Sequence, residues 1–160
     1  MIPAKEECMR ILEENNVPQN VVRHSLMVAE FSLEIANKLK SRGINVNIEL
    51  LHAAALLHDI ARGKQGDHAI IGAEMLKSMG HPEVAEVART HGLYHIPEIA
   101  PKTVEQKILF YADKRVLEDR IVSVDERFDD YRKRYADYFK KDRTEEYKYV
   151  KKIEKELGMG

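Results

Sequence analysis

The apolar residues of this chain recur mostly at intervals of three and four positions, which is the spacing of one face of an α-helix. Strand-like alternation is nearly absent, and prolines and glycines separate the apolar segments. The pattern predicts an all-α, single-domain fold. The expected helices lie at about 4–15, 19–41, 47–61, 68–79, 82–91 and 103–119, with one or two more between 125 and 157. Asp67 and Thr103 are placed to cap the fourth and sixth of these helices.

The character of the chain changes after about residue 119, where charged residues dominate and aromatic residues are interleaved with them. A helical stripe continues through Tyr131, Tyr135, Tyr138 and Phe139. We therefore expect a main domain at 1–119 and a charged helical extension at 120–160 with one apolar face. We expect the extension to pack on the main domain through this face or to continue that domain. The alternative is that the face packs against a second copy of the chain, which would form a homodimer.

Composition narrows the class of protein further. The chain has 160 residues, of which 44% are hydrophobic, and its 26 basic and 27 acidic residues leave a net charge of -1. This balance argues against nucleic acid or an anionic membrane as partner, because both attract an excess of positive charge. Cys8 is the single cysteine, and neither a membrane-spanning run nor the apolar region of a signal peptide is visible. We expect a reduced, cytoplasmic environment.

Ionisable side chains lie on the apolar faces of five predicted helices. They are His24, His58, His68, His91 and Asp113. Burying even a neutral polar group without a partner costs about 2 to 7 kcal/mol, whereas the net stability of a domain is only about 5 to 15 kcal/mol. The groups must therefore satisfy one another, and a divalent cation can do this for all of them. Imidazole and carboxylate ligands suit Zn, Fe, Mn, Co or Ni, and no cysteine accompanies them to favour a structural zinc site.

The adjacent pair His58 and Asp59 adds a second indication. Neighbours on a helix point about 100° apart, so both can face one point only near the end of the helix. In that position Asp59 can offer one carboxylate oxygen to each of two metal ions.

In order and spacing these residues resemble the signature of a known family. His24, the pair His58 and Asp59 in "AALLHDIA", and Asp113 in "LFYADK" resemble the H…HD…D signature of the HD superfamily of metal-dependent phosphohydrolases. The likeness extends over about 21–117 and implies an HD-type helical bundle. It also implies that these four residues bind a first metal ion.

The segments "DHAIIGAEML" and "VARTHGLYH" resemble the longer H…HD…H…H…D version found in dinuclear members of the superfamily. Diadenosine tetraphosphate hydrolases and cyclic-di-GMP phosphodiesterase domains are such members. This resemblance implies that His68 and His91 hold a second ion, which Asp59 bridges to the first. Ala61 replaces the glycine of the familiar HDIG, and the absence of a GYP motif argues against the cyclic-di-GMP phosphodiesterases.

Several cations near the predicted ligands are candidates for substrate contact. A divalent ion lowers the pKa of bound water from about 15.7 to about 7, so no side-chain nucleophile is required. We expect Asp59 and Arg62 to act in catalysis, and Arg62, Lys64 and Lys114 to bind the substrate phosphate, with ordinary solvated cations as the alternative. His95 is a further candidate for lining the pocket.

The predicted function is hydrolysis of a nucleotide, or of another small phosphate ester or anhydride, by a hydroxide bound to one or two divalent ions. Two alternatives stay open. One is an HD-type oxygenase with two irons, and the other is a non-catalytic module that binds a nucleotide and signals through the charged C-terminal helices. The complete set of ligand residues argues against the second alternative.

Overall fold

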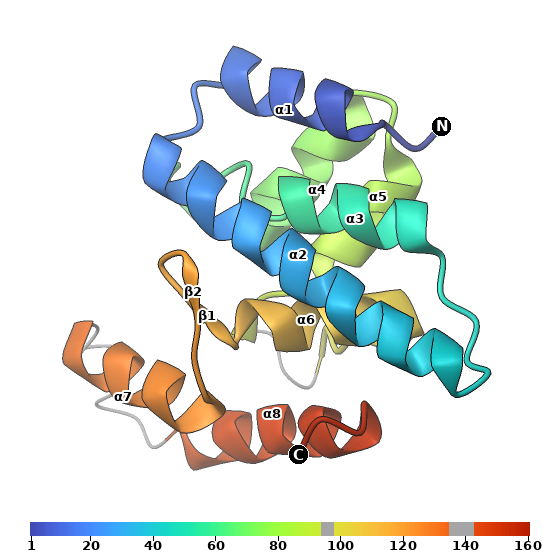
Figure 1. The fold of residues 1–160 in the computed structure, drawn as a ribbon. Coiled ribbons are helices and arrows are strands. Elements are labelled where there is room, and N and C mark those ends of the chain that lie inside the picture. The colour runs from blue at the N-terminus through green and yellow to red at the C-terminus, as the bar shows by residue number, and fades with distance from the viewer. Residues whose placement is uncertain (94–97, 135–142) are drawn as a thin grey trace.

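The computed structural model describes residues 1–93, 98–134 and 143–160 of the chain. Within these ranges it consists of helices and one short hairpin, which confirms the predicted all-α class (Figure 1). The helices are α1 (Lys5–Glu14), α2 (Gln19–Ser41), α3 (Ile48–Leu57), α4 (His68–Ser78), α5 (Pro82–Arg89), α6 (Val104–Asp113), α7 (Val124–Arg134) and α8 (Thr144–Glu156). The hairpin consists of β1 (Val116–Leu117) and β2 (Arg120–Ile121). The stripe positions Tyr135, Tyr138 and Phe139, and also His95, lie outside the described residues.

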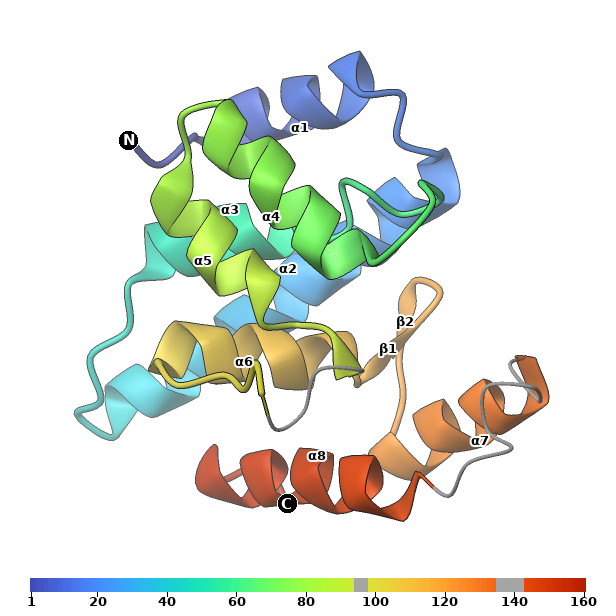
Figure 2. The same ribbon diagram turned by 180° about the vertical axis from the view of Figure 1, so that it is seen from behind.

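Helix α3 forms the centre of the molecule. Its apolar residues Leu51, Ala54, Ala55, Leu56 and Leu57 are all fully buried. The reason is that α1, α2, α5 and α6 all pack against α3, so that it has no solvent-facing side near its C-terminus. Helices α4 and α5 pack against each other on the side of α3 seen in Figure 2. The rigid core therefore surrounds the segment that leads into His58.

The structure corrects the predicted end of the third helix, because α3 ends at Leu57 and not at residue 61. Beyond Leu57 the chain tightens into turns in which backbone N–H groups bond three residues back: Ile60 to Leu57, Arg62 to Asp59 and Lys64 to Ala61. Gly63 and Gly66, both with a φ of 95°, then reverse the chain toward α4. The predicted cap of α4 is confirmed, since the Asp67 carboxylate accepts bonds from two backbone N–H groups.

The sixth helix is also shorter than predicted, ending at Asp113 instead of residue 119. The predicted cap at Thr103 is confirmed as a capping box with Gln106. After Asp113 the chain forms the hairpin, in which Val116 pairs with Ile121. The β-branched residues Val116 and Ile121 on its two arms favour extended backbone, which is consistent with the end of the helix at this point.

The C-terminal helices lie against the rest of the molecule (Figure 1). Helix α8 packs on α6, where the Tyr111 hydroxyl donates to the carboxylate of Glu154, and Val150 is fully buried. Helix α7 packs on α8, with the Phe128 and Tyr147 rings edge to face and their centroids 5.4 Å apart. Among the described residues, α8 therefore lies on α6 of the main domain, and α7 lies on α8. Association with a second copy, and the domain boundary near residue 119, stay predictions.

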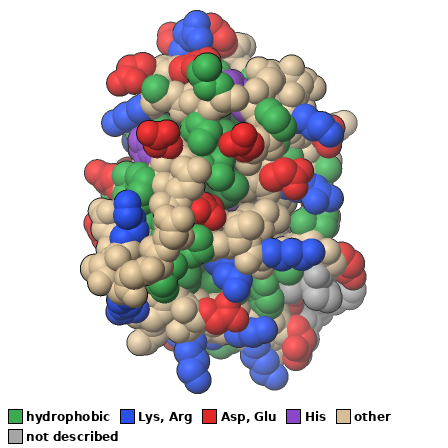
Figure 3. All heavy atoms as spheres, turned by 90° about the vertical axis from the view of Figure 1, so that its right-hand side faces the viewer, with side chains coloured by type: hydrophobic (Ala, Val, Ile, Leu, Met, Phe, Trp, Pro, Cys, Tyr) green, Lys and Arg blue, Asp and Glu red, His purple; other side chains and the backbone are tan. Residues whose placement is uncertain are grey.

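The face drawn in Figure 3 shows acidic and basic side chains interspersed with apolar ones. On this face, therefore, basic and acidic side chains are mixed, in keeping with their nearly equal numbers in the chain. Among the described helices, none has both the length and the apolar character needed to cross a bilayer.

Candidate metal centre

The structure brings the six predicted metal ligands together from five separate segments of the chain. They form two groups whose potential ligand atoms lie within 4.8 Å of one another. The first group is His24, His58, Asp59 and Asp113, and the second is Asp59, His68 and His91. Asp59 belongs to both groups, so the two potential ion sites share one carboxylate.

The first group collects donor atoms from α2, from the end of α3 and from the end of α6. The Oδ1 atom of Asp113 lies 2.9 Å from the Nε2 atom of His24 and 3.2 Å from the Nε2 atom of His58. The Oδ2 atom of Asp59 lies 3.3 Å from Nε2 of His58 and 3.7 Å from Nε2 of His24. Two imidazoles and two carboxylates thus converge on one small volume, which is a donor set that suits a transition-metal ion.

The second group uses the other oxygen of the shared aspartate. The Oδ1 atom of Asp59 lies 3.4 Å from Nε2 of His68, at the start of α4, and 3.4 Å from Nε2 of His91, just after α5. Each oxygen of Asp59 therefore faces a different pair of imidazoles. This is the arrangement that a carboxylate bridging two metal ions requires.

Backbone carbonyls fix the orientation of three of the four imidazoles. The bonded pairs are His24 Nδ1 with the carbonyl of Glu118 (2.9 Å), His58 Nδ1 with that of Ala55 (2.7 Å) and His91 Nδ1 with that of Ala88 (2.6 Å). A carbonyl oxygen only accepts hydrogen bonds, so each Nδ1 must carry the proton and donate it. The Nε2 atom of each ring is then the one that can bind a metal ion, and it is the atom that points into the centre.

Two buried polar atoms in this cluster test whether a cation fits. The Oδ1 atom of Asp59 and the Nε2 atom of His91 are buried and have no hydrogen-bond partner among the described residues. Such an atom normally costs about 1 to 3 kcal/mol, so a folded protein rarely leaves two of them facing each other. Both are metal-ligand atoms, and a divalent cation between them would satisfy both. The residues of the centre therefore fit a divalent ion.

The electrostatics of the cluster depend on its burial and on its carboxylates. Burial of His58 disfavours its charged form, but the facing charge of Asp59 and the bond to Asp113 outweigh this and raise the pKa of His58 to about 10. Burial would raise the pKa of Asp59, but the facing charge of His58 and the hydrogen bond from it hold this pKa well below its usual range. Burial, together with the charge of His91, lowers the pKa of His68 to about 4, so this imidazole is neutral and able to bind a metal ion near pH 7.

Lys114 lies behind the centre in the protein core, where its side chain is 2% exposed. Its ammonium group donates to Oδ2 of Asp113 at 2.8 Å and to the backbone carbonyl of His91 at 2.8 Å. Burial would raise the pKa of Asp113, but the charge of Lys114 and the bonds from the imidazoles hold it well below its usual range. Lys114 thus balances the charge of one ligand carboxylate, and its predicted contact with substrate stays a prediction.

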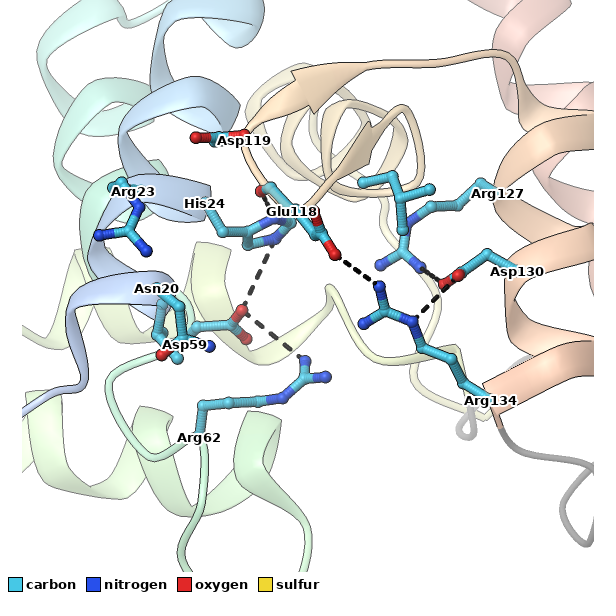
Figure 4. A pocket seen from close by; sticks show the side chains of 12 residues that line it. Asn20, Arg23, His24, Asp59, Arg62, Glu118, Asp119, Arg127, Asp130 and Arg134 are labelled. Atoms are coloured by element: carbon cyan, nitrogen blue, oxygen red, sulfur yellow. Dashed lines mark hydrogen bonds and ion pairs between the residues drawn. The ribbon is translucent and has the colours of Figure 1, made fainter.

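A cavity of about 430 Å³ opens beside the centre (Figure 4). Its walls include His24 and Asp59 of the centre, and also Arg62, whose Nη1 atom lies 3.8 Å from Oδ2 of Asp59. The Arg62 side chain is 42% exposed, so it can reach a ligand in the cavity. Lys64 is exposed in the turn that follows and is not part of the described cavity wall.

The opposite wall of the cavity was not predicted from the sequence. It consists of the hairpin, with Glu118 at its tip, and of α7, which contributes Arg127, Asp130 and Arg134 (Figure 4). The three α7 residues are spaced by three and four positions, which places them on one face of the helix. That spacing is the signal by which the sequence could have indicated a polar, inward-facing side of this helix.

Comparison with known proteins places the chain in a family. Residues 21–117 match the family model of the HD domain. An uncharacterized protein of Methanocaldococcus jannaschii is 33% identical over 144 residues, which cover 81% of this chain and 85% of that protein. A tRNA (cytidine(56)-2'-O)-methyltransferase of Picrophilus torridus is 33% identical over 146 residues, covering 81% of this chain and 41% of that protein. A ribonuclease Y of Chloroflexus aurantiacus is 37% identical over 108 residues, covering 65% of this chain and 20% of that protein.

The chain thus spans most of the first relative, but less than half of the methyltransferase and about a fifth of the ribonuclease. No solved structure matches it. The matched segment begins just before His24 and ends just after Asp113, so it contains all six residues of the cluster. The chain therefore belongs to the HD domain family, whose members are typically metal-dependent hydrolases.

Proposed function

We propose that this protein is a metal-dependent phosphohydrolase that cleaves a phosphate ester or anhydride of a nucleotide or another small molecule. The observation that carries the proposal is the position of Asp59, whose two carboxylate oxygens each face a separate pair of imidazoles. Bound divalent cations at these positions would supply Lewis-acid chemistry, activating water and neutralising charge on a phosphoryl group.

The chain's own residues contribute positioning and charge. The carbonyl of Glu118 holds the ring of His24, and Lys114 holds the carboxylate of Asp113. Arg62 reaches the cavity beside Asp59, where its guanidinium can pair with a phosphate oxygen of the substrate. His58 and Asp59 are almost fully buried, so the protein shields this side of the reacting group from bulk water.

The name of one relative supports a phosphorus-containing substrate. Ribonuclease Y is by name an enzyme that acts on RNA, whose backbone consists of phosphodiesters, and the shared part is about a fifth of it. The volume of the cavity, about 430 Å³, is that of a small-molecule site. Among phosphate compounds, this favours a nucleotide-sized substrate.

Metal analysis combined with a phosphate-release screen tests the proposal. Protein purified without chelator should contain one or two divalent ions per chain and should release phosphate from some mono- or dinucleotide, whereas chelator-treated protein should not. Asp59→Asn removes the bridging charge but keeps the shape of the side chain, so both metal content and turnover should fall, turnover by more than about 100-fold.

Asp129→Asn is the matched control, because Asp129 is 64% exposed and pairs only at the surface with Arg132. Its metal content and turnover should equal those of the wild type. Full turnover in Asp59→Asn would refute the mechanism, and oxygen consumption by the iron-loaded protein without phosphate release would favour the oxygenase alternative.

A further inference from the structure

The wall of the cavity formed by α7 carries two arginines that face the metal centre across the open space (Figure 4). Arg127 and Arg134 lie beyond residue 117, where the match to the HD domain ends. The family resemblance therefore assigns them no role. Their place in the cavity raises the question of what they bind.

Arg127 is held in a way that leaves part of its guanidinium without a partner. Its side chain is 9% exposed and lies over the ring of Tyr131, with 4.2 Å from the guanidinium carbon to the ring centroid. Its Nη1 atom is 3.9 Å from Oδ2 of Asp130, and its buried Nε atom has no hydrogen-bond partner among the described residues. The Oδ2 atom of Asp130 is also buried without a hydrogen-bond partner among the described residues, so the two groups face each other without a direct bond. Such a pair is costly to bury, and an anion in the cavity would give the guanidinium a further partner.

Arg134 is positioned next to it by two carboxylates. Its Nε atom donates to Oδ1 of Asp130 at 3.0 Å, and its Nη2 atom donates to Oε1 of Glu118 at 2.9 Å. These bonds use two of the five N–H donors of the guanidinium. Asp130 therefore lies between the two arginines and holds Arg134 by a direct bond. The Arg134 side chain is still 47% exposed, so it can reach a ligand in the cavity.

The charge of the cavity indicates the kind of ligand. Its wall carries four arginines and four carboxylates: Arg23, Arg62, Arg127 and Arg134, with Asp59, Glu118, Asp119 and Asp130. The wall is thus balanced by itself, and each divalent ion at the centre would add two positive charges. Guanidinium groups pair with phosphate through parallel N–H···O bonds. If the substrate had a single phosphate, held at the metal centre, the N–H donors of the two α7 arginines would have no phosphate to bind.

We propose that Arg127 and Arg134 bind a second phosphate group of the substrate, separate from the phosphoryl group that is hydrolysed at the metal centre. The preferred substrates are then small compounds with two phosphate groups. This inference rests on the proposed function, because it assumes that the hydrolysed group lies at the metal centre.

The test compares substrates that differ only in the second phosphate. Adenosine monophosphate, adenosine diphosphate and adenosine 3',5'-bisphosphate are offered to the metal-loaded full chain, and KM and kcat are measured for each. The variants are Arg134→Gln, which alters a half-exposed residue, and Arg127→Lys, which keeps the charge at a buried position but removes the planar fork. Arg132→Gln is the matched control on the same helix, since Arg132 is 57% exposed and pairs with Asp129.

We expect the wild type to have a lower KM for at least one two-phosphate compound than for the monophosphate. Arg134→Gln and Arg127→Lys should raise that KM about 10-fold or more, while the KM of the monophosphate changes less than about 2-fold. Arg132→Gln should match the wild type. Equal losses for all three compounds, or no loss for any, would overturn the inference.

A binding measurement separates this inference from the proposed function. Isothermal titration of the same compounds into chelator-treated protein does not depend on turnover. The second subsite is supported if a two-phosphate compound has a lower dissociation constant than the monophosphate and both variants lose this difference. This holds even if no compound is hydrolysed. Absence of that preference in the wild type refutes the subsite, whatever the outcome of the activity screen.

Discussion

A single carboxylate, that of Asp59, joins the two halves of the metal centre. Its position depends on the tightening of the chain after Leu57, which turns His58 and Asp59 toward the same region. The histidines on either side are held by their own Nδ1 bonds and so present Nε2 without further adjustment. At the scale of the residue, the site is therefore largely preorganised for metal binding.

Lys114 gives a prediction at this scale. Lys114→Met keeps the volume of the buried side chain but removes the ammonium that pairs with Asp113. The carboxylate is then left buried with less compensation, so the free energy of unfolding should fall by about 3 to 5 kcal/mol in urea titrations of metal-free protein. Lys107→Met is the control, because its pair with Glu156 is partly exposed and should contribute no more than about 1 kcal/mol. Equal effects of the two substitutions would contradict the structural role of Lys114.

At the scale of the element, the hairpin β1–β2 has a function that its small size does not suggest. It lies against α2, and its tip residue Glu118, with a φ of 59°, directs a backbone carbonyl to Nδ1 of His24. The hairpin thus fixes which nitrogen of His24 is offered to a metal ion. Since it also forms part of the cavity wall, it connects the metal centre with α7.

Two substitutions at Glu118 test this function of the hairpin. Glu118→Pro cannot adopt a positive φ, so it should turn the carbonyl away from His24 and weaken metal binding about 10- to 100-fold in a chelator competition. Glu118→Gly adopts this backbone conformation easily and should retain nearly wild-type affinity. Both variants lose the same side chain and its bond to Arg134, so their difference isolates the backbone. Identical affinities would show that the carbonyl is not needed.

At the scale of the whole molecule, the centre would act as a cross-link. Its ligands come from α2, the end of α3, α4, the end of α5 and α6, so ions bound to both groups would connect these five segments. Binding to the folded state alone adds about 4 kcal/mol of stability when free metal exceeds the dissociation constant about 1,000-fold.

The pH dependence of this stabilisation follows from His58. Without metal, the facing carboxylates raise the pKa of His58 to about 10, above its value of 6.5 in an unfolded chain. Its contribution to stability is then complete below pH 6.5 and is lost as the pH rises toward 10. In the metal-loaded protein His58 is a neutral ligand, so this loss does not occur. Scanning calorimetry should show the Tm difference between loaded and metal-free protein widening from pH 6.5 to 9, and parallel curves would contradict this.

The local pattern of residues determined much of this protein. Spacing of three and four gave the helices to within a few residues, except where α3 and α6 end early. It also placed His24, His68, His91 and Asp113 on inward faces, because periodicity reports which side of a helix is buried. The HD resemblance then supplied the grouping into two sites, and the structure gathers the same six residues.

Only the tertiary structure decided how those residues meet. His24 and Asp113 are 89 positions apart and Glu118 is 94 positions from His24, so their contacts depend on packing that no local pattern encodes. The division of the two Asp59 oxygens between two groups likewise depends on where α4 and α5 pack. The arginines of α7 belong to the charged stretch of the sequence, and only the tertiary structure places Arg127 and Arg134 in the wall of the cavity beside the metal centre. Helical periodicity specifies a face, whereas the partner of that face is set by the whole core.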